Sequence, residues 1–125
     1  MKFARIAYGV AAAYGFIALT PLYSLLGKIG PDAPPPVTHP EFYYGFVGVA
    51  LLWQMVFVLI ARDPIRYRSI MPITILEKLV YTIPVVVLYL QGQVHARIVP
   101  PSLIDPVFGV LFVFAYFRTP RPATS

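Results

Sequence analysis

The chain contains no cysteine and only five acidic residues among its 125 positions. The absence of cysteine excludes disulfides, thiolate metal sites, iron–sulfur ligation and covalent haem attachment. Charged residues make up 12% of the sequence, whereas an average soluble domain has about 25%. Because 58% of the residues are apolar, the composition predicts a protein whose solvent is a lipid bilayer.

The sequence also lacks the patterns on which several enzyme classes depend. Its two histidines, His39 and His95, lie outside the apolar segments, so we expect neither haem b nor a serine–histidine pair within a membrane. Phosphate-binding and dinucleotide-binding glycine patterns are absent. We therefore expect no cofactor. The net charge of +5 suits lipid headgroups rather than nucleic acid, because the basic residues flank apolar segments.

Apolar residues are concentrated in four segments, at residues 6–26, 42–61, 71–90 and 103–117. A helix needs about 20 residues to cross the hydrocarbon core, and short connections at 62–70 and 91–102 favour antiparallel neighbours. The sequence predicts an all-α, polytopic membrane protein. We expect a single domain, residues 1–125, folded as an antiparallel four-helix transmembrane bundle.

Proline gives the expected boundaries of these helices. The proline-rich loop 27–40 joins the first two segments and predicts extended chain rather than helix. The pair Pro100–Pro101 predicts that the fourth helix starts only after it. Asp105 and Pro106 then fit the N-cap and first helical position of that helix. Pro84 predicts a kink in the third segment.

The basic residues are distributed unevenly between the two ends of the predicted bundle. Most of them lie at the two termini and in the connection 62–70, which is a positive-inside bias. We expect both termini to be cytoplasmic, in a bacterial inner membrane. Three arginines of the connection suit anionic lipid headgroups, at about 1 kcal/mol each near the surface; they are Arg62, Arg66 and Arg68.

The third segment breaks the apolar pattern at Glu77 and Lys78. A charge at the centre of a membrane helix costs about 2.5–3.5 kcal/mol, so each requires compensation. Together with Thr74 and Tyr81, these residues follow the i, i+3, i+4, i+7 spacing of one helix face. We expect Lys78 either to pair locally or to extend to the inner surface.

Residues of two other segments lie at a similar expected depth. At 1.5 Å per residue, Glu77 lies about 9 Å inside the third segment, and we expect Tyr14 and Gln54 near that level. The predicted intramembrane polar cluster is Tyr14, Gln54, Thr74, Glu77, Lys78 and Tyr81. Glu77 is then either a structural carboxyl that fixes helix packing or a protonatable group of the kind that proton-coupled carriers use.

A second polar group is expected on the outer side, at the ends of the helices. A pocket that opened between the helices would have this group at its mouth: His39, Glu41, Tyr43, Tyr44, Gln91, His95 and Asp105. Imidazoles and carboxylates are competent metal ligands, but their spacing here forms no metal motif. We expect no metal, with His39, Glu41, His95 and Asp105 as weak candidate ligands.

Three classes of function stay open at this point. The favoured one is non-catalytic: an accessory subunit of a membrane assembly, or a bundle that binds a lipid-like ligand. Its partners would be membrane lipids, anionic on the cytoplasmic side, and other membrane subunits or further copies of this chain. The alternative is a small proton- or cation-coupled transporter that uses Glu77, and the third is a membrane enzyme with the outward His/Glu/Asp site.

Overall fold

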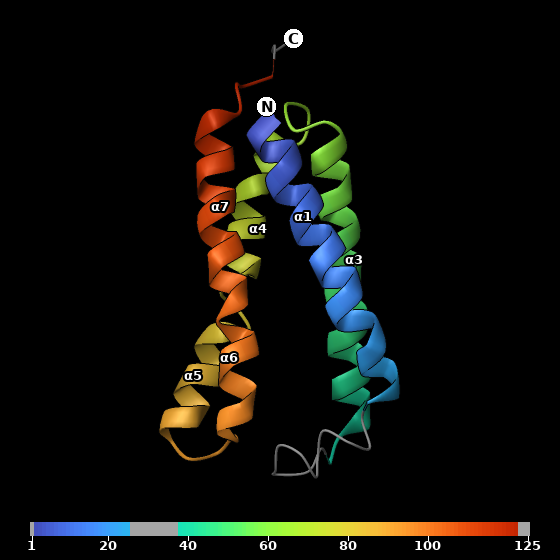
Figure 1. The fold of residues 1–125 in the computed structure, drawn as a ribbon, viewed down its shortest axis with the longest axis vertical. Coiled ribbons are helices and arrows are strands. Elements are labelled where there is room, and N and C mark those ends of the chain that lie inside the picture. The colour runs from blue at the N-terminus through green and yellow to red at the C-terminus, as the bar shows by residue number, and fades with distance from the viewer. Residues whose placement is uncertain (1, 26–37, 123–125) are drawn as a thin grey trace.

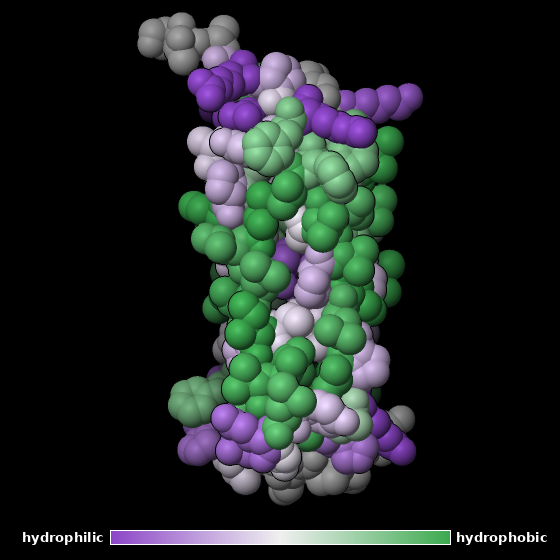
Figure 2. Space-filling model, turned by 90° about the vertical axis from the view of Figure 1, so that its left-hand side faces the viewer, coloured by the Kyte–Doolittle hydropathy of each residue, from purple (hydrophilic) through white to green (hydrophobic). Residues whose placement is uncertain are grey.

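The computed structural model describes residues 2–25 and 38–122, and these residues are all-helical, without a β-strand. Four segments of 23 residues are long enough and apolar enough to cross a membrane: Lys2–Ser24, Pro40–Arg62, Arg68–Leu90 and Ala96–Arg118. Figure 2 shows the resulting apolar band between two hydrophilic ends. The predicted helical class is confirmed. Most of the predicted proline-rich loop, 27–40, lies outside the described residues.

The first two segments form one arm of the molecule (Figure 1). The first consists of α1 (Lys2–Leu19) and a 3₁₀ segment, η1 (Thr20–Ser24), and the second is a single helix, α3 (Pro40–Arg62). Pro21 lies within η1 and Pro40 is the first residue of α3. At Pro40 the ring costs no hydrogen bond, because a backbone N–H in the first turn has no helical partner. Pro21 lies where the first segment changes from α to 3₁₀ geometry.

Helices α1 and α3 run in opposite directions and pack closely. At one end, Arg5 Nη1 donates to the carbonyl of Arg62 at 3.0 Å, and at the other the Tyr43 hydroxyl donates to the carbonyl of Leu22 at 2.7 Å. Small side chains let membrane helices approach each other. The buried small residues of α1 are Ala4, Ala7, Ala11, Ala12 and Gly15.

The third segment belongs to the second arm and is interrupted. It consists of η2 (Arg68–Ile70), α4 (Met71–Glu77), a turn at 78–81 and α5 (Thr82–Leu90). The third segment is therefore not one continuous helix over 71–90: it is interrupted one turn before Pro84, the residue at which the sequence predicts a kink. Pro84 gives the reason, because it has no N–H to donate to the carbonyl of Val80 and its ring crowds that turn of helix.

The fourth segment is helical from an earlier residue than the sequence predicts. It consists of η3 (Ala96–Ile98), α6 (Val99–Ser102) and α7 (Ile104–Arg118). The predicted start at residue 103 is wrong, because Pro100 and Pro101 lie in the first turn of α6, where proline costs no hydrogen bond. Asp105 is consequently not an N-cap; Leu103 holds that position and Asp105 lies in the first turn of α7.

Hydroxyl groups satisfy carbonyls at these interruptions. Thr82 Oγ1 donates to the carbonyl of Ser102 at 2.6 Å, and Ser102 Oγ donates to the carbonyl of Val99 at 2.6 Å. The Ser102 carbonyl lies at the end of α6, where carbonyls have no intrahelical donor, and in a bilayer only the protein itself supplies one; the Val99 carbonyl also accepts from the Leu103 N–H at 3.2 Å. The bond from Thr82 also joins α5 to the end of α6.

Aromatic side chains fill the core between the two arms. This core lies toward the end of the molecule where α1 begins and α7 ends (Figure 1). The Tyr8 ring stacks on Phe112 with centroids 4.0 Å apart, and Phe57 lies edge-on to Phe112 at 5.1 Å. The hydroxyls of Tyr8 and Thr74 are 2.8 Å apart and share a hydrogen bond. We call this region, formed by α1, α4, α7 and the second half of α3, the closed half. The remainder, η1, α5, α6 and the first half of α3, is the open half.

Candidate functional site

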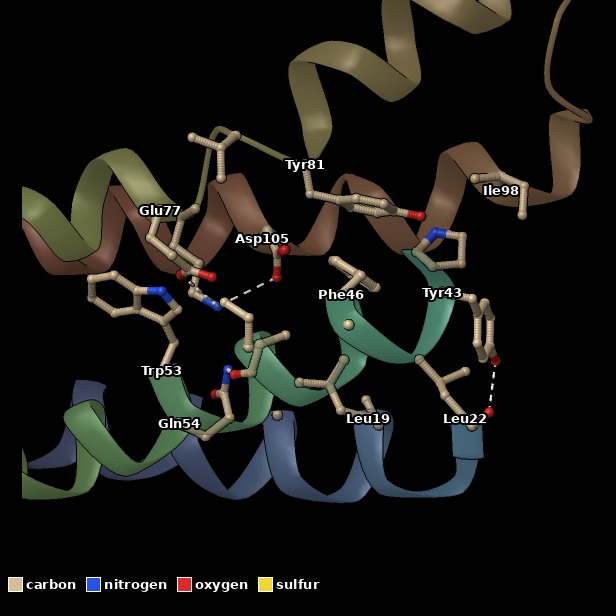
Figure 3. Close-up of a pocket in the computed structure, with 18 of the residues that line it drawn as sticks. Leu19, Leu22, Tyr43, Phe46, Trp53, Gln54, Glu77, Tyr81, Ile98 and Asp105 are labelled. Atoms are coloured by element: carbon tan, nitrogen blue, oxygen red, sulfur yellow. Dashed lines mark hydrogen bonds and ion pairs between the residues drawn. The ribbon is translucent and has the colours of Figure 1, made fainter. Parts of the chain in front are cut away.

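A cavity of about 960 Å³ lies between the two arms, between the charged residues near mid-length and the far end of the open half. One wall comes from α1, η1 and α3, and the other from α4, the 78–81 turn, η3, α6 and α7 (Figure 3). Side chains such as Leu19, Val49 and Ile98 make these walls mostly apolar. The volume lies in the range of small-molecule sites, about 300–1,000 Å³.

Three charged side chains meet at the inner part of this cavity. Lys78 Nζ lies 3.5 Å from Asp105 Oδ1 and 3.8 Å from Glu77 Oε2, and Lys78 is only 3% exposed. Figure 3 shows both carboxylates beside the amine. In Figure 2 a hydrophilic spot lies at mid-height in a recess of the apolar face. We call Glu77, Lys78 and Asp105 the charged cluster.

The helix interruptions hold the charged cluster in place. Lys78 is the C-cap of α4, and Asp105 lies in the first turn of α7. A cation near a helix C-terminus and an anion near an N-terminus are both stabilised by the peptide dipoles. The ammonium of Lys78 also lies 4.9 Å from the ring centroid of Phe57 and 5.7 Å from that of Phe108. Lys78 therefore pairs at this depth and does not extend to the surface.

Gln54 reaches the cavity from α3 and packs against Gly15 of α1. A Cβ at position 15 would overlap the side chain of Gln54, so this close approach requires glycine. Gln54 Nε2 donates to the carbonyl of Ala50 at 2.9 Å. Among the described residues, Gln54 Oε1 and Glu77 Oε2 are the buried side-chain polar atoms without a hydrogen-bond partner. Both belong to residues that line the cavity.

The structure brings most of the predicted intramembrane polar cluster to one cavity. Its lining includes five of the six residues: Tyr14, Gln54, Glu77, Lys78 and Tyr81. Thr74 lies elsewhere, because its hydroxyl bonds to Tyr8 and donates to the carbonyl of Met71 at 2.7 Å. Thr74 therefore contributes to the closed half and not to the site.

The predicted outer group is divided by the structure. Glu41, Tyr43 and Asp105 line the cavity, but Asp105 belongs to the charged cluster rather than to the mouth. The other four residues contact near neighbours instead: His39 Nδ1 lies 3.0 Å from Glu41 Oε1, Tyr44 stacks on Tyr23, Gln91 Oε1 accepts from Gln93, and His95 Nδ1 accepts from the Arg97 N–H.

The described residues contain no group of three or more histidines and acids that could hold a metal ion. His39 and His95, the two imidazoles among the candidate ligands, are occupied by their local contacts with Glu41 and Arg97. The structure therefore gives the weak metal candidates no shared site in the part of the chain that it describes.

The three arginines of the 62–70 connection have different surroundings. Arg62 and Arg66 are exposed at the closed end, and the backbone N–H of Arg66 donates to Asp63 Oδ1 at 3.3 Å. Arg68 Nε donates to the carbonyl of Thr119 at 2.8 Å, and its guanidinium lies 4.0 Å above the Tyr116 ring. Arg68 therefore ties the connection to the end of α7, whereas the other two face outward.

Comparison with models of protein families, with curated proteins and with solved structures finds no match. The site therefore has to be interpreted from its own chemistry.

Sequence reasoning missed the pairing of Asp105 with Lys78 because it placed Asp105 at the start of a helix. A signal was present: the predicted segment 103–117 is shorter than the about 20 residues that a span needs. Extending it to Ala96, as the structure does, puts Asp105 near mid-length. Trp53 and Phe46 also line the cavity, and nothing in the apolar pattern distinguishes them from lipid-facing residues.

Proposed function

We propose that this chain is an integral membrane protein that binds one amphipathic, lipid-like molecule between the two arms of an antiparallel four-helix bundle. The observation that carries the proposal is the cavity of about 960 Å³ with apolar walls and a charged cluster at its inner end. An alkyl chain suits the walls, and a polar head group suits the cluster. Such a combination of apolar lining and few convergent polar groups is typical of ligand sites.

The packing between the arms supports a ligand in the open half. In a bilayer, helices associate through van der Waals contacts and hydrogen bonds, because lipid is as apolar as their side chains. The closed half has these contacts in its aromatic core and in the Tyr8–Thr74 hydrogen bond. In the open half Phe46 stacks on Tyr81 at 5.2 Å, and much of the remaining space between the arms is cavity. A bound molecule would supply the missing contacts.

The distribution of charge supports one orientation in the membrane. Basic side chains gather at the closed end, among them Arg5, Arg62, Arg66 and Arg118. By the positive-inside rule, this end and both termini would face the cytoplasm of a bacterial inner membrane, against anionic lipids. The cavity would then open toward the opposite face. Ala7, Ala11 and Gly15, the small residues spaced four apart on α1, are buried inside the chain, so they offer no free surface to another subunit.

A photolabelling experiment tests the proposal. The purified chain in phosphatidylcholine nanodiscs is exposed to three amphiphiles that share a diazirine-bearing C12 chain and carry an amine, an alcohol or a carboxylate head. We expect at least one of them to label cavity residues such as Leu19 and Trp53 saturably. The same peptides contain lipid-facing positions such as Leu52, 61% exposed, and labelling there should not saturate.

A matched pair of variants separates the cavity from the lipid. Gly45 lines the cavity and a Cβ added to it meets nothing within 4 Å, so Gly45→Phe should fill the cavity and abolish saturable labelling. Gly9 has equally open surroundings but does not line the cavity, so Gly9→Phe should leave labelling unchanged. Equal labelling of Gly45→Phe and the unaltered chain would contradict the proposal.

A further inference from the structure

The unpaired groups of the cavity indicate which head group it takes. We infer that the ligand is a cationic amphiphile whose head donates hydrogen bonds, with the chemistry of a long-chain primary ammonium. The inference rests on the proposed function and adds the class of ligand to it. Three independent features carry it: the sign of the charge, the kind of atom left without a partner, and the aromatic lining.

The first feature is an excess of negative charge. Two carboxylates, Glu77 and Asp105, face the single ammonium of Lys78, so the charged cluster has a formal charge of −1. The whole lining adds Glu41 and Arg97, and three acids with two bases again give −1. A net charge is costly in a low-dielectric cavity, and a cation beside it removes that cost. An anionic head group would increase it.

The second feature is the identity of the two orphaned atoms. Gln54 Oε1 and Glu77 Oε2 are buried without a hydrogen-bond partner, and both are acceptors. They come from opposite arms, from α3 and α4 respectively. Gln54 is 2% exposed, so bulk water does not satisfy it. Lys78 Nζ is an ion-pair partner of Glu77 Oε2, but at 3.8 Å it lies beyond hydrogen-bond distance of that atom.

A head group that donates several hydrogen bonds matches this arrangement. An ammonium has three donors and no acceptor, so a head beside the charged cluster can donate to Glu77, and to Gln54 Oε1 once the Gln54 carboxamide turns away from Gly15, against which it packs. A carboxylate or phosphate head would bring further acceptors and leave both atoms unpaired. Each buried polar group left without a partner costs free energy, so the cavity discriminates against such heads as well as attracting the ammonium.

The third feature is the aromatic lining near the charged cluster. Tyr14, Phe46, Trp53 and Tyr81 all line the cavity, as do the three residues of the charged cluster. Aromatic ring faces attract cations, most strongly for tryptophan and more strongly when water is excluded. The Lys78 ammonium already lies over the Phe57 ring at 4.9 Å. The site therefore has both carboxylates and ring faces with which to hold a second cation.

Tryptophan fluorescence gives a direct test, because Trp53 is the only tryptophan of the chain and lines the cavity. Nitroxide-labelled C12 chains with an amine, an alcohol or a carboxylate head are titrated into phosphatidylcholine nanodiscs that hold the full chain. Quenching in Gly45→Phe is subtracted, because it measures partition into the bilayer. We expect the amine to bind about tenfold more tightly than the alcohol, since a charge-assisted hydrogen bond contributes about that factor, and the carboxylate to bind most weakly.

Variants connect this preference to the orphaned atoms. Glu77→Gln should bring the amine to about the affinity of the alcohol, and Gln54→Leu should weaken the amine while all charges stay in place. Asp63→Asn is the matched control, because Asp63 is an exposed carboxylate outside the cavity lining, and its loss should leave the order of the heads unchanged. If Glu77→Gln does not fold, the affinity of Gln54→Leu for the amine tests the inference by itself.

The outcomes separate the two proposals. An alcohol or carboxylate that binds as tightly as the amine overturns the inference about the head group, and the saturable binding leaves the proposed function standing. An amine preference that survives Gln54→Leu and Glu77→Gln unchanged also overturns the inference. Absence of saturable quenching by all three amphiphiles overturns both proposals together.

Discussion

The two halves of the molecule have the same kind of residues but different packing. The closed half buries Tyr8, Phe57 and Phe112 against one another, with each side chain fully buried. Phe46 of the open half lines a cavity instead, together with Trp53 and Tyr81 at the boundary between the two halves. In a membrane, apolar composition does not decide between these outcomes, because lipid and protein are equally apolar surroundings. Complementary shape and hydrogen bonds decide where helices close.

The largest loss of stability should follow a substitution in the charged cluster, which lies at the boundary between the two halves. Lys78→Met leaves Glu77 and Asp105 buried without a counter-ion, and breaking a buried ion pair in this way costs about 3–5 kcal/mol. The free energy of unfolding, measured by denaturant titration in mixed micelles, should fall accordingly. Asp105→Asn in the same chain should restore part of the loss. An additive effect of the two substitutions would show that the residues do not interact.

A substitution in the core of the closed half should cause the second-largest fall in the free energy of unfolding. Phe112→Ala removes a ring that stacks on Tyr8 and leaves a void, at a cost of about 3 kcal/mol in a well-packed core. Phe114 lies on the same helix and is 52% exposed, so Phe114→Ala is the matched control and should change the free energy of unfolding little. If both variants lost equal stability, the core would not lie where the structure puts it.

A substitution at the contact between α1 and α3 should lower the stability by an intermediate amount. Gly15→Ala forces the Gln54 side chain to move, because a Cβ there would overlap it, and overpacking typically costs about 1–3 kcal/mol. Gly9→Ala places a Cβ in open space on the same helix and should be neutral or slightly stabilising. Thermal unfolding of the two variants in one detergent measures the difference.

The smallest effect is expected in the open half. Thr82→Val removes the hydrogen bond from Thr82 to the carbonyl of Ser102 and nearly preserves volume, so the loss should be about 1 kcal/mol. Hydrogen exchange of the α5 and α6 amides should rise while that of α1 and α3 stays unchanged. Increased exchange in the closed half as well would mean that the two halves do not open independently.

The sequence predicted the helices better than their interruptions. Hydropathy alone located the four segments and placed Tyr14, Gln54 and Glu77 at one level, because these depend only on composition and rise per residue. The sequence did not predict the position of Asp105 within its helix. The prediction started the fourth helix after Pro100 and Pro101, although the first turn of a helix accepts proline. Cavity walls cannot be predicted from apolarity, because a cavity wall and a lipid-facing surface use the same side chains.

The division of the charged cluster between two segments has a consequence for biosynthesis. Lys78 and Asp105 are 27 positions apart, so in a chain that inserts into a membrane as proposed, the third segment reaches the translocation machinery before its second counter-ion has been made. Until the fourth segment arrives, only the adjacent Glu77 can compensate Lys78, and insertion of the third segment alone costs more free energy. The last two segments should therefore partition into the lipid together, as a helical hairpin, and truncation after Leu90 should leave a chain that inserts poorly.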